Sequence, residues 1–325
     1  DTPLKTKRGL TRVVLGIVVL ILGVIIVDFL GNRPDRRGEN PYALEVDQYK
    51  EVDPELISHK ETRNFSLGSM VTTDMSLHDN KLYISADSLL VVLPLDGSQA
   101  LRHKILPGAT SLEVDDQHVF VGFGTYVAKY SHEAELLQAW SDLGERAVIT
   151  NLAIKEDNIY VADAGNRRIV IFNRDGEQTG EFEGKAETEA GHGFIIPSAN
   201  FDLAVNSYGE LWVVNPAKHA LENYSDEGRL RGFWESRSFE IDGFLGCCNP
   251  ARITTLEDGS FVTSEKGMVR IKIFDQSGKL LSVVAPPALF TQGGEDAKAP
   301  EVCADENGVI YALDFERNML RVFET

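Results

Sequence analysis

Hydrophobic and polar residues follow two different patterns along the chain. Near the N-terminus one long apolar run, VVLGIVVLILGVIIVDFLG, extends from Val13 to Gly31 and carries no charge between Val13 and Val27. From Phe65 onward the pattern changes to short alternating runs separated by glycine-containing turns. Alternation with a period of two predicts half-buried β-strands, whereas the long apolar run predicts a helix. The sequence therefore predicts an N-terminal helix followed by an all-β domain.

The β-rich part of the chain repeats itself. Residues 151–183 and 252–284 each read as a strand, a turn, a second strand, a polar loop, a third strand, a glycine turn and a fourth strand. The same hydrophobic position of the first strand recurs six times, at Met75, Leu112, Leu152, Leu203, Ile253 and Val302. Units that recur in this way along the chain are typical of radial repeat folds. Six units of four strands therefore predict a six-bladed β-propeller.

The last unit is one strand short. Residues 301–325 hold enough chain for three strands, and the segment TRNFSLG, residues 62–68, precedes the first unit without belonging to it. An open ring would leave sheet edges and a blade face exposed. We therefore expect the N-terminal segment to supply the outer strand of the last blade and close the ring.

The third unit carries a family resemblance. Its sequence NLAIKEDNIYVADAGNRRIVIFNRDG, residues 151–176, resembles an NHL repeat, and the fifth and sixth units resemble it less closely. The resemblance implies a propeller over residues 65–325. NHL-like relatives include lyases, lactonases and interaction modules, so the resemblance implies a fold and leaves the activity open.

The apolar run is long enough for a membrane helix. A span needs about 20 apolar residues, and no cleavage site of a secretory signal follows this one. Lysines and arginines before the run place the N-terminus in the cytoplasm under the positive-inside rule, although arginines also follow it. The expected organisation is a cytoplasmic segment at 1–12, a transmembrane anchor at 13–31, an extended linker at 32–61 and an NHL-like propeller at 62–325. The predicted location is the cell membrane, single-pass, with the propeller on the extracytoplasmic, periplasmic side.

Charge limits the possible partners. The formal net charge is −18 at pH 7, and an anionic surface repels nucleic acid. The expected partners are the lipid bilayer, through residues 13–31, and one or more membrane proteins, through the anchor helix and the linker.

The first strands of the six units are expected to border the central channel. One polar position per unit then forms a ring at its mouth: Asp74, Ser111, Asn151, Asp202, Arg252 and Glu301. Asp74, Asn151, Asp202 and Glu301 could supply oxygen ligands to a cation, and the resemblance extends to calcium-dependent propeller lactonases that gather such residues. Arg252 would neutralise those charges, so the alternative is a salt-bridged polar rim.

The three cysteines are predicted to approach the same channel mouth. Cys247 and Cys248 lie in the loop GFLGCCNP, before the fifth unit's first strand, and Cys303 lies on the next unit's first strand. His192 occupies the equivalent loop before the fourth unit. Three thiols and an imidazole suit zinc, copper or an iron–sulfur cluster. Outside the cytoplasm a disulfide competes, and unpaired packed thiols are a third possibility.

No complete catalytic set is apparent. The sequence lacks a Ser-His-Asp order and an H-E-x-x-H pattern, and the other histidines are predicted to lie singly in turns or at strand ends. We expect a membrane-anchored, non-enzymatic interaction protein that serves as an accessory or stabilising subunit of a larger membrane complex and needs no cofactor. The alternative is a propeller metalloenzyme or redox protein with one metal ion at the channel mouth.

Overall fold

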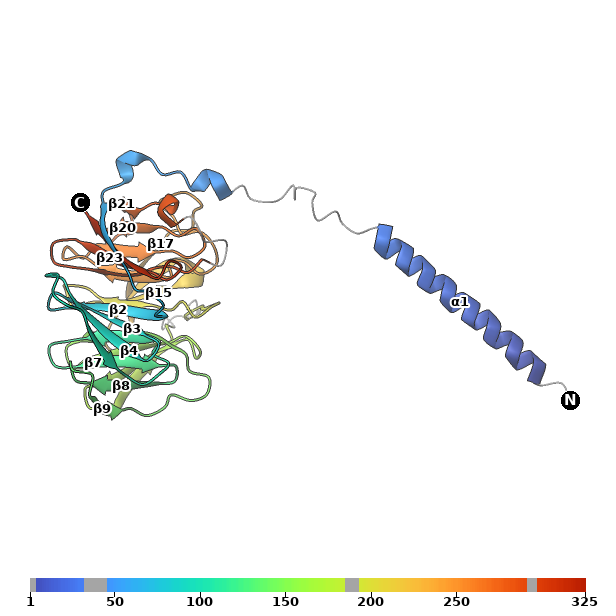
Figure 1. Cartoon of the computed structure of the whole chain (residues 1–325), viewed down its shortest axis with the longest axis horizontal. Helices are drawn as coiled ribbons and strands as arrows, with labels where there is room; N and C mark the ends of the chain where they lie inside the picture. The colour runs from blue at the N-terminus through green and yellow to red at the C-terminus, as the bar shows by residue number, and fades with distance from the viewer. Residues whose placement is uncertain (1–3, 32–45, 185–192, 291–296) are drawn as a thin grey trace. The chain divides into compact units, whose positions relative to one another are not determined.

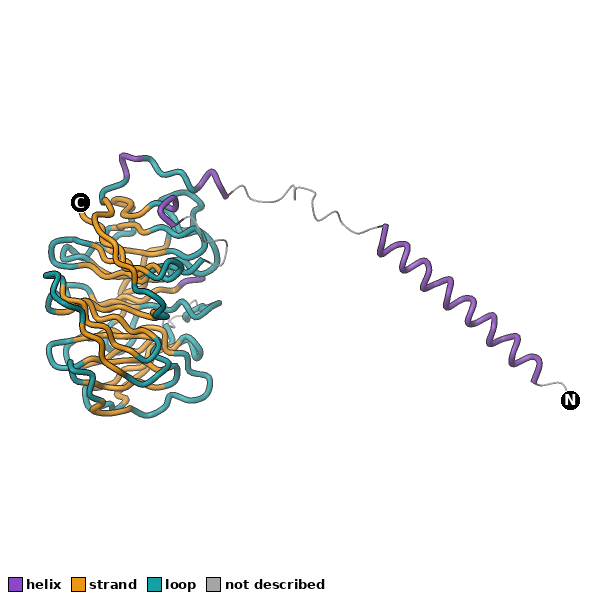
Figure 2. The backbone as a smooth tube through the Cα atoms, viewed as in Figure 1, coloured by secondary structure: helices purple, strands orange, loops and turns teal. Residues whose placement is uncertain are grey.

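The computed structural model of the chain describes residues 4–31, 46–184, 193–290 and 297–325. The chain divides into two units, Asp1–Val46 and Asp47–Thr325. Strands dominate the second unit, as Figure 2 shows.

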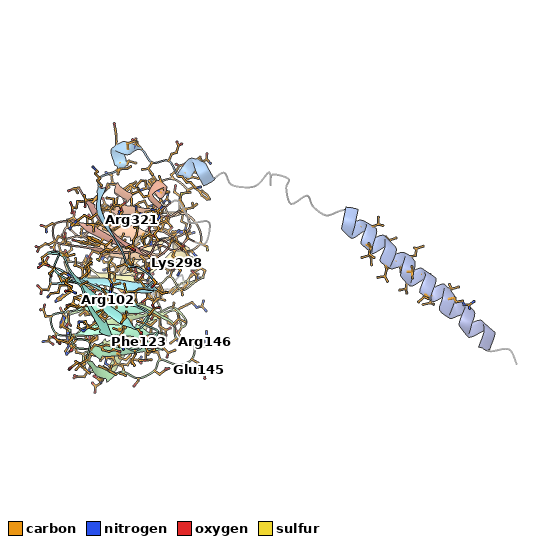
Figure 3. All side chains as sticks on the ribbon, viewed as in Figure 1. Arg102, Phe123, Glu145, Arg146, Lys298 and Arg321 are labelled. Carbon is orange, nitrogen blue, oxygen red and sulfur yellow. The ribbon has the colours of Figure 1, made fainter. Side chains whose placement is uncertain are left out.

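The first unit holds one helix, α1, from Leu4 to Gly31. The side chains described on it run from Arg12 to Asp28, and its large apolar ones are 45–71% exposed (Figure 3). In the part of the chain that the structure describes, no helix is both long and apolar enough to cross a membrane. The predicted helix is therefore present, and its role as a transmembrane anchor is not confirmed.

The second unit is a six-bladed β-propeller, as the repeat predicted. Its described residues form six antiparallel sheets of four strands each. Blade 1 contains β2 (Thr72–His78), β3 (Lys81–Ala86), β4 (Leu89–Pro94) and β5 (Leu101–Lys104); blade 2 contains β6 (Ser111–Val114), β7 (Val119–Phe123), β8 (Tyr126–Tyr130) and β9 (Leu136–Ala139); blade 3 contains β10 (Ile149–Lys155), β11 (Asn158–Asp163), β12 (Arg168–Asn173) and β13 (Gln178–Phe182). Blade 4 contains β14 (Leu203–Val205), β15 (Leu211–Asn215), β16 (Ala220–Tyr224) and β17 (Leu230–Glu235); blade 5 contains β18 (Arg252–Thr255), β19 (Phe261–Ser264), β20 (Ile271–Phe274) and β21 (Leu280–Ala285); blade 6 contains β22 (Glu301–Ala304), β23 (Ile310–Asp314), β24 (Met319–Glu324) and β1 (Lys60–Ser66). Short 3₁₀ turns lie at η1 (Val46–Tyr49), η2 (Pro54–Leu56), η3 (Pro216–Lys218) and η4 (Pro287–Phe290).

The hydrophobic core lies between the blades. Every residue of β7 and of β15 is buried, because both faces of a middle strand contact a neighbouring blade. One cluster joins Phe120 and Val127 of blade 2 to Leu152 and Val161 of blade 3. The outermost strands β5 and β9 carry mostly exposed side chains. The hydrophobic positions of the alternating pattern are thus the ones that pack between neighbouring sheets.

The ring closes with an N-terminal strand. β1 pairs antiparallel with β24, and Phe65 lies opposite Leu320. In Figure 1 the blue segment that precedes β2 runs beside the red strands at the C-terminus. Arg321, labelled in Figure 3, donates a hydrogen bond of 2.5 Å to the carboxylate of Glu61. The predicted closure is confirmed, with the strand running from Lys60 to Ser66.

The residues just before β1 lie on the outer edge of blade 5. Ile57 forms a parallel bridge with Val283 of β21, and the Ser58 amide donates to the Val283 carbonyl at 3.0 Å. The Ser58 hydroxyl donates to the hydroxyl of Ser282 at 2.8 Å. The N-terminal segment therefore contacts blades 5 and 6 in succession.

Glycine turns pack against large aromatic rings of the preceding blade. Gly278 has φ +84°, and a Cβ built on it would lie 2.5 Å from the Trp234 indole on β17. Gly176 stands in the same relation to Trp140, which follows β9. The turn glycines therefore permit both a left-handed backbone and close packing between blades.

Candidate functional site

The first strands of the blades enclose a central cavity of about 170 Å³. All six blades contribute to its lining. The polar lining residues include Asp74, Ser76, Glu113, Asn151, Thr254, Glu301 and Cys303. The structure thus places three of the four predicted oxygen ligands on the cavity wall, and the fourth, Asp202, lies directly before β14.

Asp74 and Asp202 bind the backbone of the following blade. The Asp74 carboxylate accepts a hydrogen bond from the backbone amide of Met75 at 2.9 Å. It also accepts one from the backbone amide of Leu112, in blade 2, at 2.6 Å. Asp202 in blade 4 accepts from the Ile253 amide of blade 5 at 2.6 Å. These two carboxyl groups therefore connect neighbouring inner strands.

Arg252 lies between the acidic residues. Its Nε is 3.0 Å from the Glu301 Oε2, and its Nη1 is 4.0 Å from the Asp202 Oδ1. Nη1 also donates to the Thr150 carbonyl of blade 3 at 3.3 Å. Glu301 is buried and the Arg252 side chain is 13% exposed, so this guanidinium is the counter-charge that compensates the carboxylates.

Burial controls the protonation of the channel acids. Desolvation, followed by the charge of Glu301, raises the pKa of Asp202 to about 8, although Arg252 opposes the shift. The pKa of Asp74 is raised for the same reasons. Burial also raises the pKa of Glu113 to about 8, against a hydrogen bond from Ser76. Burial therefore favours the protonated form of these channel acids, which limits the negative charge available to a cation.

The predicted metal ligands occupy different surroundings. Among the described residues, no group of three or more His, Cys, Asp or Glu is arranged to hold a metal ion. Cys303 is buried and lines the central cavity. Cys247 is exposed and Cys248 is buried, and neither lines that cavity. His192 lies outside the described residues, so its place in a ligand set stays a prediction.

The two adjacent cysteines are close to each other. Their Sγ atoms are 3.2 Å apart. Burial raises the pKa of the Cys248 thiol, against a hydrogen bond from Ser198. The exposed thiol of this pair is accessible to reagents in solution, whereas the buried thiol of Cys303 is not.

Sequence reasoning missed a buried ionic cluster beneath this loop. Glu265, Arg270 and Lys272 have fully buried side chains, and Glu265 Oε1 lies 2.8 Å from both Arg270 Nε and Lys272 Nζ. Lys272 also lies 4.7 Å from the centre of the Phe244 ring. In sequence the three residues fall on or near alternating positions of two strands. Their polarity at positions expected to be buried was the signal available.

A second missed cluster lies at the turns of blades 1 and 2. His78 Nε2 lies 3.1 Å from the Asp116 carboxylate, and the Tyr83 hydroxyl is 2.9 Å from Nδ1 of His132. The two imidazole rings are 6.3 Å apart beside a cavity of about 330 Å³. The prediction that these histidines lie singly was wrong, because packing between blades brings distant turns together.

Comparisons with known proteins identify the architecture. No protein-family model matches the chain, and no curated protein matches it. Among solved structures, virginiamycin B lyase from Staphylococcus aureus is similar at 14% identity and a TM-score of 0.57, over 82% of this chain and 99% of that one. A streptogramin B lyase is similar at 12% identity and a TM-score of 0.57, over 82% of this chain and 97% of the lyase.

A third similar structure is the WD40 β-propeller domain of Doa1. It has 13% identity and a TM-score of 0.55, over 82% of this chain and 97% of the domain. Identities this low establish the fold alone. The comparisons do not confirm the resemblance to NHL repeats. The chain has the fold of a β-propeller, whose known examples include both lyases and a WD40 domain.

Proposed function

We propose that this chain is a membrane-tethered β-propeller that docks on a membrane protein and stabilises a larger complex, and that its central channel catalyses no reaction. The propeller would lie on the extracytoplasmic side. In this account the ring of blades is a rigid platform, and the segment before it ties that platform to the bilayer.

The observation that carries the proposal is the use of the channel's charged groups. Asp74 and Asp202 accept hydrogen bonds from the inner strands of the next blades, and Arg252 pairs with Glu301. A general base or nucleophile must be able to reach a reacting atom. Asp74, Asp202 and the Arg252–Glu301 pair instead contact the backbone and one another, which supports a structural role.

The tether rests on the sequence of the N-terminal unit. Val13 to Val27 carries no charge, and Lys5, Lys7 and Arg8 lie on its N-terminal side. An apolar helix with basic residues before it favours insertion with the N-terminus in the cytoplasm. The apolar side chains of α1 are exposed, and contact with a bilayer would remove them from water.

Co-purification tests this function. The full-length chain is extracted from its native membrane in mild detergent, and the eluate is separated by size before mass spectrometry. We expect one or more membrane proteins to elute with the chain at a fixed ratio. Two matched controls are residues 1–46 alone, which should lose these proteins, and residues 47–325 on an unrelated membrane anchor, which should retain them at reduced yield. Absence of any protein at a fixed ratio would contradict the proposal.

A second function is favoured by the central cavity. Asp202 and Glu113 have pKa values raised to about 8, and groups with such shifts occur at catalytic sites. In this alternative the channel belongs to an enzyme or redox protein and holds one metal ion. Elemental analysis of the purified chain distinguishes the two functions. A metal at one equivalent that is lost in Asp202→Asn would favour the alternative.

A further inference from the structure

The loop that carries the adjacent cysteines combines an exposed thiol with a buried one. Cys247 is exposed, Cys248 is 1% exposed, and their sulfur atoms are 3.2 Å apart. A disulfide bond is about 2.0 Å long, so a displacement of roughly 1 Å would bring the sulfurs to bonding distance. The pair can therefore receive a reagent at one sulfur and react internally at the other.

The side chain of Asn249 connects the backbone before the pair to the turn that follows β19. Its Nδ2 donates to the carbonyls of Leu245, at 2.5 Å, and of Lys266, at 3.1 Å. Its Oδ1 accepts from the Lys266 amide at 2.9 Å. The loop is thus tied to itself and to the turn that follows β19.

The buried ionic cluster holds the start of the same loop. Arg270 Nη2 and Lys272 Nζ donate to the Gly243 carbonyl at 2.8 and 2.6 Å, and Glu265 Oε2 accepts from the Leu245 amide at 3.2 Å. Burying charges is costly unless they are paired and hydrogen-bonded. A surface loop held by three buried charges keeps one conformation, so the two thiols stay adjacent.

We propose that Cys247 and Cys248 form a thiol–disulfide exchange site whose substrate is a disulfide of a peptide or protein. The Cys247 thiolate attacks one sulfur of the substrate, and a mixed disulfide forms as the other substrate sulfur leaves and takes up a proton. Cys248 then loses its proton to water and attacks Cys247 Sγ, which closes the Cys247–Cys248 bond and releases the second substrate thiol. The two protein thiols are oxidised by two electrons, and the substrate disulfide is reduced to two thiols.

The placement of the sulfurs sets their roles. Attack on an external disulfide needs an accessible sulfur, and Cys247 is the exposed member of the pair. Cys248 is buried and reaches only nearby atoms, so it resolves the mixed disulfide. Cys303 is buried on the cavity wall and serves as an internal control. This site does not depend on the docking function proposed above.

Oxidised glutathione is a suitable probe. The full-length protein is reduced, freed of reductant, incubated with the probe, and then denatured and alkylated for thiol counting and peptide mass spectrometry. We expect one thiol, that of Cys303, to remain, and the peptide with both adjacent cysteines to lose two hydrogens and retain no glutathione. Cys248→Ser should trap one glutathione on Cys247, and Cys247→Ser should react at least roughly tenfold more slowly. Cys303→Ser should close the Cys247–Cys248 bond at the wild-type rate.

Three results would overturn the proposal. They are a stable glutathione adduct on Cys247 in the wild type, a disulfide that includes Cys303, and reaction of the denatured chain alone. Asn249→Ala separates positioning from reactivity, because it leaves both thiols in place. We expect it to slow closure of the Cys247–Cys248 bond and to accumulate the glutathione adduct while the rate of adduct formation stays unchanged. An unchanged rate of closure in this variant would show that the Asn249 contacts do not position the two thiols. Circular dichroism confirms that each variant is folded.

Discussion

The Arg252 guanidinium on β18 lies 3.0 Å from the Glu301 carboxylate on β22, so a buried ion pair joins the inner strands of blades 5 and 6. The same guanidinium contacts the Thr150 carbonyl of blade 3. One side chain therefore connects three blades across the channel, and its removal should affect the whole ring.

Replacing Arg252 with methionine should strongly destabilise the propeller. Arg252→Met leaves the Glu301 carboxylate buried without its counter-charge, which typically costs about 3–5 kcal/mol. Urea unfolding of the full-length chain measures this change. Arg102→Met on the exposed strand β5 is the matched control and should cost less than about 0.5 kcal/mol. Equal losses in the two variants would contradict the role given to Arg252.

The protonation of Glu113 should make stability depend on pH. The folded protein keeps this proton up to a pKa of about 8, whereas an unfolded glutamate loses it near 4.5. Between these values the folded state binds more protons, so the contribution of Glu113 to stability falls as pH rises. In the wild type, Glu113 should lower the free energy of unfolding by up to about 1.4 kcal/mol per pH unit between roughly pH 5 and 7.5. The Glu113→Gln variant should lack this contribution to the pH dependence.

The control for this titration is Glu135→Gln, on an exposed turn of blade 2. It should leave the pH profile of the free energy of unfolding unchanged. A Glu113→Gln profile parallel to that of the wild type would show that the Glu113 carboxyl is ionised in the folded protein.

Truncation before and after β1 should give different stabilities. Deletion through Gly68 removes the strand that pairs with β24, including the Phe65–Leu320 register and the Glu61–Arg321 contact. Exposing a blade face costs several kcal/mol at about 25 cal/mol per Å² of apolar surface. Deletion through Ser58 removes the contacts with β21 and the ring contact between Tyr49 and Phe239 but leaves β1 in place, so its loss should be smaller. Equal melting temperatures for the two truncated chains would contradict closure by β1.

Alanine substitutions at Gly278 and Gly97 distinguish the cost of backbone strain from the cost of a packing clash. Their φ angles are +84° and +83°, but a Cβ on Gly278 would clash with the Trp234 indole, whereas a Cβ on Gly97 would meet nothing within 4 Å. Gly97→Ala should cost about 1–2 kcal/mol through its backbone conformation. Gly278→Ala should cost a further 1–3 kcal/mol or so through overpacking. Thermal unfolding of both variants measures the difference in stability. Equal losses of stability would show that a clash with Trp234 makes no contribution.

The fold was predictable because its signals are local and repeated. Alternating strands, turn glycines and the missing last strand define six blades, and β1 pairs with β24 as expected. The inner positions Asp74, Asn151 and Glu301 also lie on the channel wall as predicted. Each of these inferences needs only the strand period and the repeat.

The contacts within the candidate sites were less predictable. Whether Asp202 holds a cation or an amide depends on where the Ile253 amide lies, and sequence spacing does not fix that distance. The His78–His132 pair arises from packing between turns of neighbouring blades. Glu265, Arg270 and Lys272 belong to one hairpin of blade 5, but their contacts with Gly243 and Leu245 come from the preceding loop, whose position the repeat does not define. Side-chain partners across blades are set by the three-dimensional arrangement, so they had to come from the structure.

Native mass spectrometry of the detergent-extracted chain tests the central claim most directly, because one spectrum reports both bound proteins and bound metal. The chain is released from its own membrane without overexpression, and its mass is compared before and after unfolding. The account predicts a complex that contains the chain and at least one membrane protein at a fixed ratio, and that dissociates to the bare polypeptide mass. A monomeric chain that carries one equivalent of metal would contradict it and identify the channel as an active centre.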